Sequence, residues 1–339
     1  DHCGEGYLKI MKKYHIVTGG MGFIGSALVW QLNEMGIDDI IVVDIPGQSE
    51  SWKNLVNLKF ADIFDRDEFI LKLEKGTFNG CISGILHMGA CSDTTEKDFS
   101  FLLENNYHYT KKLAIWANAR NCRFIYASSA ATYGNGPEFS DNEEKLHLLK
   151  PLNRYGYSKH LFDLWAYKNQ LLSKIAGLKF FNVFGPNEYH KGEMKSVVVK
   201  KYFEILKTGT AQLFKSYRKD SPDGEQKRDF IYVKDAVKMT LFIYFHSAIN
   251  GIFNIGTGKA RSFNDIVKIA FKTLGKRENI QYIEMPESIK NSYQYFTQAD
   301  ISKLRAAGYQ ENLFTLEQAI EDYIKNYLQH QDPYLKVNR

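Results

Sequence analysis

A tyrosine and a lysine four positions apart form the side-chain pair in this sequence that is best suited to moving a proton. Tyr155 and Lys159 stand in the motif YGYSK, and a predicted helix there projects both side chains from one face. A free phenol titrates near pH ~10, but a neighbouring cation favours the phenolate and lowers its pKa. The spacing therefore predicts an acid–base tyrosine that is tuned by the lysine.

The residues around Tyr155 separate this pair from the second Tyr-x-x-x-Lys match, Tyr107 with Lys111. The segment RFIYASSAATYG predicts a strand that ends near Ser129, and open α/β sheets bind ligands at the carboxyl ends of their strands. The Ser129 hydroxyl can there hydrogen-bond the same substrate oxygen as Tyr155. We therefore expect Ser129, Tyr155 and Lys159 to be catalytic. Tyr107 and Lys111 are interpreted as an ordinary pair on a helix surface.

A glycine-rich turn follows the first predicted strand, in the segment HIVTGGMGFIGS at positions 15–26. Gly19, Gly22 and Gly25 allow a tight turn, close approach of a pyrophosphate and close packing of the helix on the sheet. The helix N-terminus then offers free N–H groups and a positive dipole end to phosphates. Asp44 ends the next strand, nineteen residues after Gly25, where an acid can meet an adenosine ribose. The pattern predicts a dinucleotide site.

The predicted elements that position these residues alternate between strand and helix through the first half of the chain. Their apolar runs are short and unbroken, such as GILHMGA, which is typical of strands buried on both faces of a parallel sheet. Right-handed crossovers then give a Rossmann-like, doubly wound α/β fold with a smaller C-terminal α/β lobe. We expect residues 1–10 to be an N-terminal extension or remnant without a role, 11–185 to form an NAD(P)-binding Rossmann domain, and 186–339 to form mainly a substrate-binding lobe.

The composition argues against several classes of protein. The 339 residues are 44% hydrophobic and 24% charged, as in an ordinary globular protein. The net charge is 44 minus 39, or +5, without a long basic run, so nothing favours nucleic acid as a partner. No apolar stretch approaches the ~18–20 residues that span a bilayer, and no signal peptide opens the chain. We expect a cytoplasmic protein without a membrane partner.

The cysteines Cys3, Cys81, Cys91 and Cys122 show no metal-ligand spacing. This scatter predicts free thiols and no bound metal.

Several motifs resemble the extended short-chain dehydrogenase/reductase superfamily: TGGMGFIG, HMGA, SSAATYG and YGYSK. The more specific segments HKG and FTQADISKLRAAGY are similar to the ADP-L-glycero-D-manno-heptose 6-epimerase family, and the resemblance extends from about Tyr14 to Tyr327. It implies an enzyme that inverts C-6'' of the heptose in a nucleotide-activated sugar, for the inner core of lipopolysaccharide. Bound NADP would oxidise the alcohol to a ketone and return the hydride to the other face. The resemblance also implies a homo-oligomer, a pentamer.

The resemblance assigns roles to individual residues. Tyr155 would serve one orientation of the sugar and Lys191, in YHKG, the other, while Lys159 tunes Tyr155. The implied cofactor residues, besides these three and the residues of the glycine turn, are Phe23, Ile24, Asp44, Ile45, Met88, Gly89, Ala90, Cys91, Ser92, Asn105 and Val183. The implied substrate residues are Asn182, Phe214, Lys215, Ser216, Tyr217, Arg228 and Tyr293.

Arg228, in KRDF, suits a diphosphate because its guanidinium fork bonds two oxygens at once. The alternative interpretation is a loop ion pair with Asp229 or Asp223.

The loop after the second strand departs from the family pattern. Ile45 and Ser51 stand where the family has a polar residue and a lysine that meets the 2'-phosphate of NADP. Asp44 suits the free 2'-hydroxyl of NAD, whereas Lys53 and Arg66 remain as phosphate partners. We expect NADP, with NAD as the alternative.

Glu193 and Lys200 replace a small hydroxyl residue and a histidine of the family's substrate site, so the sugar or nucleotide can differ from the usual one. A 4,6-dehydratase needs an acid and a base where this chain has Ala130 and Ala131. A UDP-hexose 4-epimerase would share the catalytic residues but does not need the lysine of HKG. A non-enzymatic dinucleotide sensor need not keep Ser129, Tyr155 and Lys159 together.

Overall fold

The computed structural model describes residues 12–136 and 138–338, so the expected N-terminal extension lies outside the described residues. The chain forms two compact units. Unit 1 contains Asp1–Lys179, Val237–Phe253 and Tyr334–Arg339, and unit 2 contains Phe180–Ala236 and Asn254–Pro333.

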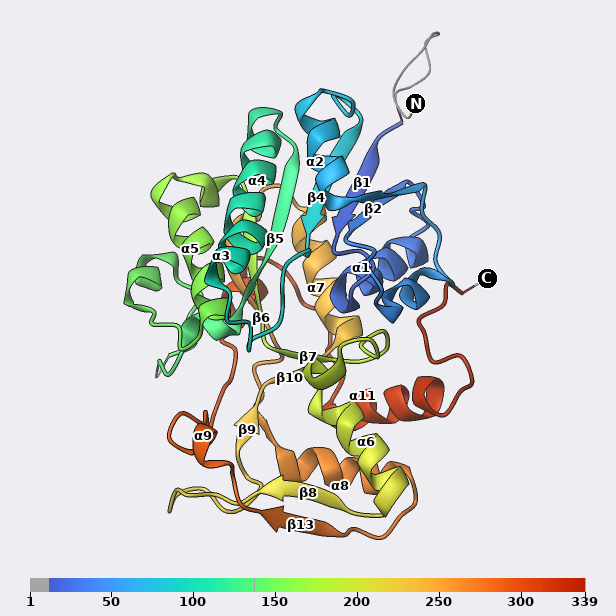
Figure 1. The fold of residues 1–339 in the computed structure, drawn as a ribbon, viewed down its shortest axis with the longest axis vertical. Helices are drawn as coiled ribbons and strands as arrows, with labels where there is room; N and C mark the ends of the chain where they lie inside the picture. The colour runs from blue at the N-terminus through green and yellow to red at the C-terminus, as the bar shows by residue number, and fades with distance from the viewer. Residues whose placement is uncertain (1–11, 137, 339) are drawn as a thin grey trace. The chain divides into compact units, whose positions relative to one another are not determined.

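Unit 1 is built on a 7-stranded sheet with the order β11-β6-β5-β4-β1-β2-β3 (Figure 1). Its strands are β1 (Tyr14–Thr18), β2 (Ile40–Asp44), β3 (Asp62–Asp65), β4 (Ile82–His87), β5 (Arg123–Ser129), β6 (Ala176–Phe180) and β11 (Gly251–Ile255). The pairs β1–β2, β1–β4, β2–β3 and β4–β5 are parallel. Since the chain runs outward from β1 to β3 and then crosses to β4, the strand order reverses between β1 and β4, as in a doubly wound fold. The predicted Rossmann-like α/β class is confirmed.

The helices of this part of the chain alternate with the strands. They are α1 (Phe23–Glu34), α2 (Arg66–Glu74), α3 (Phe99–Leu102), α4 (Tyr109–Ala119), α5 (Arg154–Lys168) and α7 (Val233–Phe245), with a π-helical stretch, Leu103–His108, between α3 and α4. Ile16, Ile85 and Phe124 are register partners across the sheet and share one buried cluster with Leu113 of α4 and Phe162 of α5. This row fixes α4 and α5 on one face of the sheet.

The opposite face receives α7. The Tyr244 hydroxyl is 2.7 Å from Nδ1 of His15, and a Cβ added at Gly84 would lie 2.4 Å from that hydroxyl oxygen. Because Gly84 of β4 has no side chain, the Tyr244 ring of α7 can pack against the strand.

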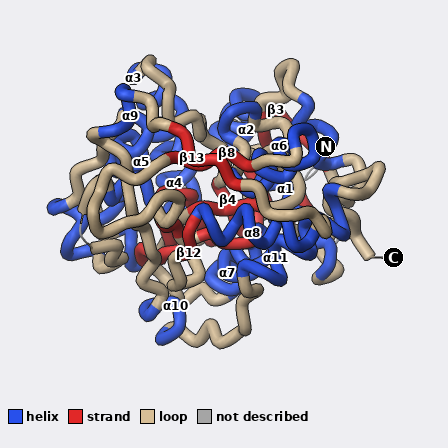
Figure 2. The backbone as a smooth tube through the Cα atoms, turned by 90° about the horizontal axis from the view of Figure 1, so that it is seen from below, coloured by secondary structure: helices blue, strands red, loops and turns tan. Residues whose placement is uncertain are grey.

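Unit 2 is smaller and more irregular. Its strands are β7 (Asn182–Phe184), β8 (Ala211–Phe214), β9 (Lys227–Arg228), β10 (Phe230–Tyr232), β12 (Arg261–Ser262) and β13 (Ile280–Ile283), and its helices are α6 (Val197–Thr208), α8 (Phe263–Thr273), α9 (Glu287–Lys290), α10 (Ser302–Ala306) and α11 (Leu316–Tyr323). They form the two-stranded sheets β10–β7, β12–β9 and β13–β8; Figures 1 and 2 show β8 and β13 side by side. Val199, Ile266 and Ile320 are buried together where α6, α8 and α11 pack.

The division between the units differs from the single boundary that the sequence predicts after residue 185. The chain leaves unit 1 after Lys179 but returns with 237–253, because β11 joins the sheet next to β6. The C-terminal segment also belongs to unit 1, where Nε1 of Trp30 donates a hydrogen bond to the carbonyl oxygen of Lys336 at 2.8 Å. Both segments lie far along the sequence from the rest of unit 1, so the sequence did not indicate that they belong to it.

The sequence predicts that all four cysteines are free thiols, but the structure differs from this prediction. Cys91 and Cys122 are free thiols, whereas Cys81 is disulfide-bonded, and Cys3 lies outside the described residues. The prediction is therefore wrong for Cys81, because spacing along the chain does not report distance in the fold. Within the described ranges, no cluster of three or more His, Cys, Asp or Glu residues suits a metal ion. In the same ranges no helix has the length and apolar character needed to span a membrane.

Candidate active site

The glycine-rich turn between β1 and α1 leaves no room for side chains. Gly19 has a φ of +63°, and a Cβ there would lie 2.7 Å from the Gly89 backbone. A Cβ at Gly25 would lie 2.0 Å from the carbonyl oxygen of Gly19. Gly22 begins α1 without a side-chain cap, which suits a helix N-terminus that binds phosphate. Phe23 and Ile24 are the first residues of this helix.

A pocket in unit 1 lies where the strand order reverses, and most of its lining was predicted from the motifs. Its predicted members are Gly19, Asp44, Ile45, Arg66, Gly89, Ala90, Cys91 and Asn105, and its other members are Thr18, Val43, Phe101 and Tyr109. Met88 and Ser92 flank Gly89–Cys91 in the sequence. Phe101 and Tyr109 come from α3 and α4, where no motif marked them.

Asp44 is fixed by the backbone of the glycine turn. Its Oδ2 accepts a hydrogen bond from the Met21 N–H at 2.9 Å, and its Oδ1 accepts one from the Ile45 N–H at 2.7 Å. Burial raises the pKa of this carboxyl, while the N–H groups of Ile45, Met21 and Gly22 oppose the rise. The carboxylate is thus held at the pocket, and each oxygen already accepts one hydrogen bond.

Arg66 and Lys53, the two predicted partners for a 2'-phosphate, lie in different settings. Arg66 lines the pocket; its guanidinium lies 4.0 Å over the Tyr109 ring and donates to Oδ1 of Asn105, and its side chain is 15% exposed. Lys53 is not part of the pocket lining and pairs with Glu50 at 2.6 Å on the surface. Of the two cations, Arg66 is the one placed to meet a ligand in this pocket.

Ser129, Tyr155 and Lys159 are brought together at the end of β5. Asn153 caps α5 by accepting a hydrogen bond from the Gly156 N–H at 2.7 Å, so Tyr155 and Lys159 lie in the first turns of that helix. Burial raises the pKa of the Tyr155 phenol, and its hydrogen-bonding contact with Ser129 opposes the rise. A lowering by Lys159 and a nicotinamide cation stays a prediction.

Lys159 is buried, and its Nζ donates a hydrogen bond to the carbonyl oxygen of Ala127 at 2.9 Å. Burial lowers the pKa of this ammonium to about 8, and Asp163 opposes the shift. The second Tyr-x-x-x-Lys pair differs. Tyr107 lies in the π-helical stretch and Lys111 in α4, and Nζ of Lys111 is 4.8 Å from the ring centre of Tyr107. That contact agrees with an ordinary pair of side chains.

Asn106 is a buried residue at the site that the motifs did not identify. Its Oδ1 accepts from the Cys91 N–H at 2.9 Å, and its Nδ2 donates to the Cys91 carbonyl at 3.1 Å and to Ser158 Oγ at 3.0 Å. Ser158 Oγ in turn donates to the Tyr155 carbonyl at 2.7 Å. The turn after β4 is therefore tied to α5. The only signal in the sequence is the doubled asparagine, of which Asn105 alone was predicted.

Arg228 of unit 2 lies between two aromatic rings. Its guanidinium carbon is 5.2 Å from the ring centre of Tyr293 and 5.5 Å from that of Phe263, and Nη1 donates to the Lys227 carbonyl at 2.8 Å. Burial lowers the pKa of the guanidinium, and Tyr293 opposes the shift. Arg228 is therefore a half-buried cation whose guanidinium fork can bind an anion.

The alternative of a loop ion pair is contradicted by the carboxylates next to Arg228. Asp229 accepts the backbone N–H groups of Thr257, Gly258 and Ala299 at 2.8, 2.9 and 3.0 Å. Asp223 accepts the Ser216 N–H at 2.7 Å. Neither forms an ion pair with Arg228 in the described part of the chain, because both are used to fix loops.

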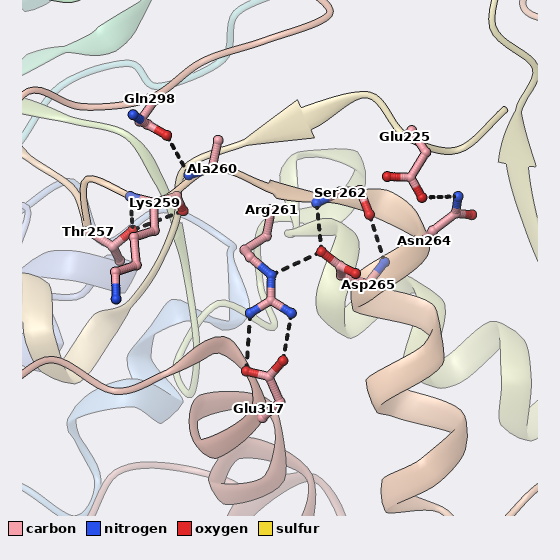
Figure 3. Close-up of polar contacts among 10 residues, drawn as sticks. All are labelled: Glu225, Thr257, Lys259, Ala260, Arg261, Ser262, Asn264, Asp265, Gln298 and Glu317. Carbon is pink, nitrogen blue, oxygen red and sulfur yellow. Dashed lines mark hydrogen bonds and ion pairs between the residues drawn. The ribbon is translucent and has the colours of Figure 1, made fainter. Parts of the chain in front are cut away.

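A second arginine holds the strand beside Arg228 in place (Figure 3). Arg261 of β12 is the register partner of Arg228. It donates to Glu317 through both terminal nitrogens, at 3.1 and 2.6 Å, and to Asp265 through Nε at 2.9 Å. Asp265 and Ser262 also form a capping box at the N-terminus of α8. The next residue, Phe263, carries one of the two rings near Arg228. Arg261 is thus a structural residue.

Of the other predicted substrate residues of unit 2, Phe214 contacts Tyr293. The Phe214 ring lies 6.1 Å from the Tyr293 ring, edge to face. Lys215 pairs with Glu284 at 2.9 Å, and the Tyr217 hydroxyl donates to the same carboxylate. Ser216 donates its N–H to Asp223, and Asn182 and Val183 lie in β7, paired with β10.

Lys191 and the two departures from the family pattern lie in the segment before and within α6. Burial lowers the pKa of Lys191, and the carboxylate of Glu188 opposes the shift. Glu193 and Lys200 contact one another, with 3.6 Å between Oε2 and Nζ. The two residues that replace the family's usual pair therefore form an exposed ion pair of their own.

Residues 15–256, which include the pocket and the Ser129, Tyr155 and Lys159 group, match the model of the NAD dependent epimerase/dehydratase family. The chain belongs to this family. It is 51% identical over 322 residues, covering 95% of the chain and 100% of the relative, to the ADP-L-glycero-D-manno-heptose-6-epimerase of Nitratidesulfovibrio vulgaris strain DP4. It is 48% identical over 331 residues to the enzyme of the same name from Fusobacterium nucleatum, covering 94% of the chain and 99% of the relative.

A solved structure agrees with these relatives. The crystal structure of the Helicobacter pylori ADP-L-glycero-D-manno-heptose-6-epimerase matches with a TM-score of 0.77 and 29% identity, covering 93% of this chain and 96% of that one. The family resemblance inferred from the sequence is confirmed, and the chain is an epimerase, an isomerase.

Proposed function

We propose that the protein inverts C-6'' of the heptose in ADP-D-glycero-D-manno-heptose and so produces ADP-L-glycero-D-manno-heptose. The observation that carries the proposal is the group of Ser129, Tyr155 and Lys159 at the end of β5. The relatives of the chain, which are named ADP-L-glycero-D-manno-heptose-6-epimerase, support it. A second candidate, a UDP-hexose 4-epimerase, is not favoured, because the relatives at 51% and 48% identity carry the heptose name.

The chemistry follows from the carbon that is inverted. A secondary alcohol has no acidic neighbouring proton, so direct deprotonation is not available, and oxidation to a ketone is needed. The nicotinamide supplies the hydride acceptor and, after the sugar reorients, the hydride donor. Tyr155 takes and returns the alcohol proton, Ser129 hydrogen-bonds the same oxygen, and the charge of Lys159 favours the phenolate.

Lys191 acts on the sugar in its second orientation. Burial lowers the pKa of its ammonium, which brings proton exchange nearer to neutral pH. Its chemistry differs from that of a solvated loop lysine for this reason.

The cofactor is NADP. Arg66 supports this choice, since its largely buried guanidinium lines the pocket that Asp44 also lines. Asp44 already accepts N–H groups on both oxygens, so a 2'-hydroxyl would be an added partner rather than a required one. NAD is the alternative cofactor.

The diphosphate of the nucleotide sugar binds at Arg228, whose guanidinium has no carboxylate partner among the described residues. Phe214 to Tyr217 and Tyr293 complete this site. We further propose that the product supplies lipopolysaccharide inner-core synthesis in the cytoplasm and that the enzyme is a homo-oligomer, a pentamer by family resemblance.

The test is to incubate the enzyme separately with ADP-D-glycero-D-manno-heptose and with UDP-galactose. We expect inversion of the heptose and no 4-epimerisation of the hexose. Turnover of UDP-galactose without turnover of the heptose would support the 4-epimerase instead.

A further inference from the structure

Asp163 and Lys179 form a buried ion pair in unit 1. The side chains of Asp163, on α5, and Lys179, on β6, are 0% and 1% exposed, and Oδ2 lies 3.6 Å from Nζ. Taking two charges out of water is costly, and an apolar pair of similar volume often gives equal or greater stability. The pair therefore calls for a role besides stability.

The carboxylate of Asp163 holds α5 against β5. Its Oδ1 accepts from the Tyr126 hydroxyl at 2.8 Å, and its Oδ2 accepts from the Ser128 hydroxyl at 2.8 Å. Between these two residues lies Ala127, whose carbonyl accepts from Lys159 at 2.9 Å. Since Lys159 precedes Asp163 by one helical turn, the same contacts that fix Asp163 also fix the position of Lys159.

The ammonium of Lys179 is connected to Ser129 through hydrogen bonds of Thr132. It donates to Oγ1 of Thr132 at 2.8 Å, and that hydroxyl donates to the carbonyl oxygen of Ser129 at 2.8 Å. The ammonium also lies 4.4 Å from the centre of the Tyr133 ring. The backbone of Ser129 is thus held by a hydroxyl that the cation orients.

We propose that Asp163 and Lys179 are a positioning pair for the reaction, which holds Ser129 and Lys159 in place, and that the carboxylate of Asp163 keeps Lys159 charged. The inference rests on the proposed roles of Ser129, Tyr155 and Lys159. Neither member of the pair is itself a catalytic residue, because both act through other side chains.

The charges around the pair determine what its loss would do. The titratable groups that interact with the pair or with Lys159 are Tyr126, His160, Asp141, Cys91 and His87, and Glu143 acts on Tyr126. Burial lowers the pKa of Lys159 to about 8, and Asp163 is the first of the groups that oppose this shift. Burial also lowers the pKa of Lys179, and Asp163 and Asp141 oppose it.

The two single variants should therefore act in opposite directions on the alkaline limb of the activity profile, where Lys159 loses its charge. Asp163→Asn removes an anion near Lys159, so we expect the limb to move to lower pH by about 1 unit. Lys179→Met removes the cation that competes for Asp163, so we expect the limb to move to higher pH. A role only in folding would lower the yield or the melting temperature of both variants without opposite shifts.

The experiment measures kcat/KM against pH for the full chain and for Asp163→Asn, Lys179→Met, Lys179→Arg and the double variant Asp163→Asn/Lys179→Met. Lys179→Arg keeps the charge and should restore the wild-type limb. The double variant buries no unpaired charge and should resemble Asp163→Asn. If Lys179→Met does not fold, the comparison of Lys179→Arg with the double variant decides.

A matched pair in unit 2 serves as the control. Asp322 accepts from the Tyr232 hydroxyl at 2.6 Å and pairs with Lys234 at 2.9 Å, so Asp322→Asn repeats the same chemical change in the other unit. We expect it to leave the alkaline limb in place. An unshifted limb in both Asp163→Asn and the double variant would overturn the inference. Substantial activity in Lys159→Met would instead overturn the proposed role of Lys159, so the two failures are distinguishable.

Discussion

Lys159 donates its ammonium hydrogen bond to the carbonyl oxygen of Ala127 at 2.9 Å, and this contact fixes the lysine at the carboxyl end of β5. The same burial lowers its pKa to about 8. The charge that we propose to favour the Tyr155 phenolate is therefore lost within the range in which the enzyme can be assayed.

The first prediction concerns pH. Since the proposed role of Lys159 requires its ammonium form, kcat/KM should fall about tenfold per pH unit above a pKa of about 8. Lys159→Arg keeps a cation that does not deprotonate, so any activity it retains should not fall in that range. Lys111→Arg, in the second Tyr-x-x-x-Lys pair, is the control and should leave the profile unchanged. An alkaline limb in Lys159→Arg identical to the wild type would contradict the assignment.

The second prediction isolates the Tyr155 hydroxyl. Tyr155→Phe removes one oxygen and keeps the ring, so fold and cofactor content should stay intact. Epimerisation should fall by about a hundred- to ten-thousand-fold, as for other general acid–base groups. Tyr107→Phe is the matched control. More than a third of the wild-type rate in Tyr155→Phe would rule out its catalytic role.

The third prediction concerns the 2' position of the cofactor. Arg66→Ala should weaken NADP binding by roughly ten- to a hundredfold, the worth of a charge-assisted hydrogen bond, and should leave NAD binding nearly unchanged. Lys53→Ala, which removes a cation outside the pocket, should change neither. Titration of both cofactors into apoprotein measures these affinities. Equal losses for NAD and NADP in Arg66→Ala would show that Arg66 does not read the phosphate.

In the same titration, Asp44→Ala tests the neighbouring acid. It removes the acceptor for the Met21 and Ile45 N–H groups, so we expect it to weaken both cofactors by disturbing the turn. A loss confined to NAD would instead assign Asp44 to a free 2'-hydroxyl and favour NAD as the cofactor.

The fourth prediction separates substrate binding from structure in unit 2. Arg228→Lys keeps the charge but loses the planar fork, so KM for the nucleotide sugar should rise about tenfold or more while the fold stays intact. Arg261→Lys breaks a comparable arginine contact with Glu317 and Asp265 and should lower the melting temperature with little change in KM. The opposite pattern would make Arg228 the structural residue of the two.

The parts of the fold that depend on local patterns were predictable from the sequence. The glycine turn, its strand and its helix follow from spacing within residues 15–34, and Asp44 follows from the next strand. The sequence also indicated Ser129, Tyr155 and Lys159, because each stands in a short motif next to a predicted strand or helix, and their catalytic roles stay predictions.

The parts that depend on distant contacts were not predictable. Asn106 reaches Cys91 from a π-helical turn, and Lys179 meets Asp163 across two elements, so neither has a local signal. β11 returns to the sheet far along the chain, and no local pattern in the sequence indicates this return. The alternative of an ion pair between Arg228 and Asp229 or Asp223 could be rejected only from the structure, in which both carboxylates accept backbone N–H groups.

In the proposed mechanism, Tyr155 and Lys191 exchange the proton in the two orientations of the sugar. Lys191→Met keeps much of the apolar stem and removes only the titratable group, so cofactor binding should change little. The most direct measurement is dismutation of a hexose aldehyde analogue of the intermediate, in which one molecule is oxidised while another is reduced. We expect Tyr155→Phe and Lys191→Met each to slow dismutation in part, the double variant to stop it, and Lys191→Met to be deeply impaired in epimerisation. Dismutation and epimerisation at the wild-type rate in Lys191→Met would contradict the two-residue mechanism.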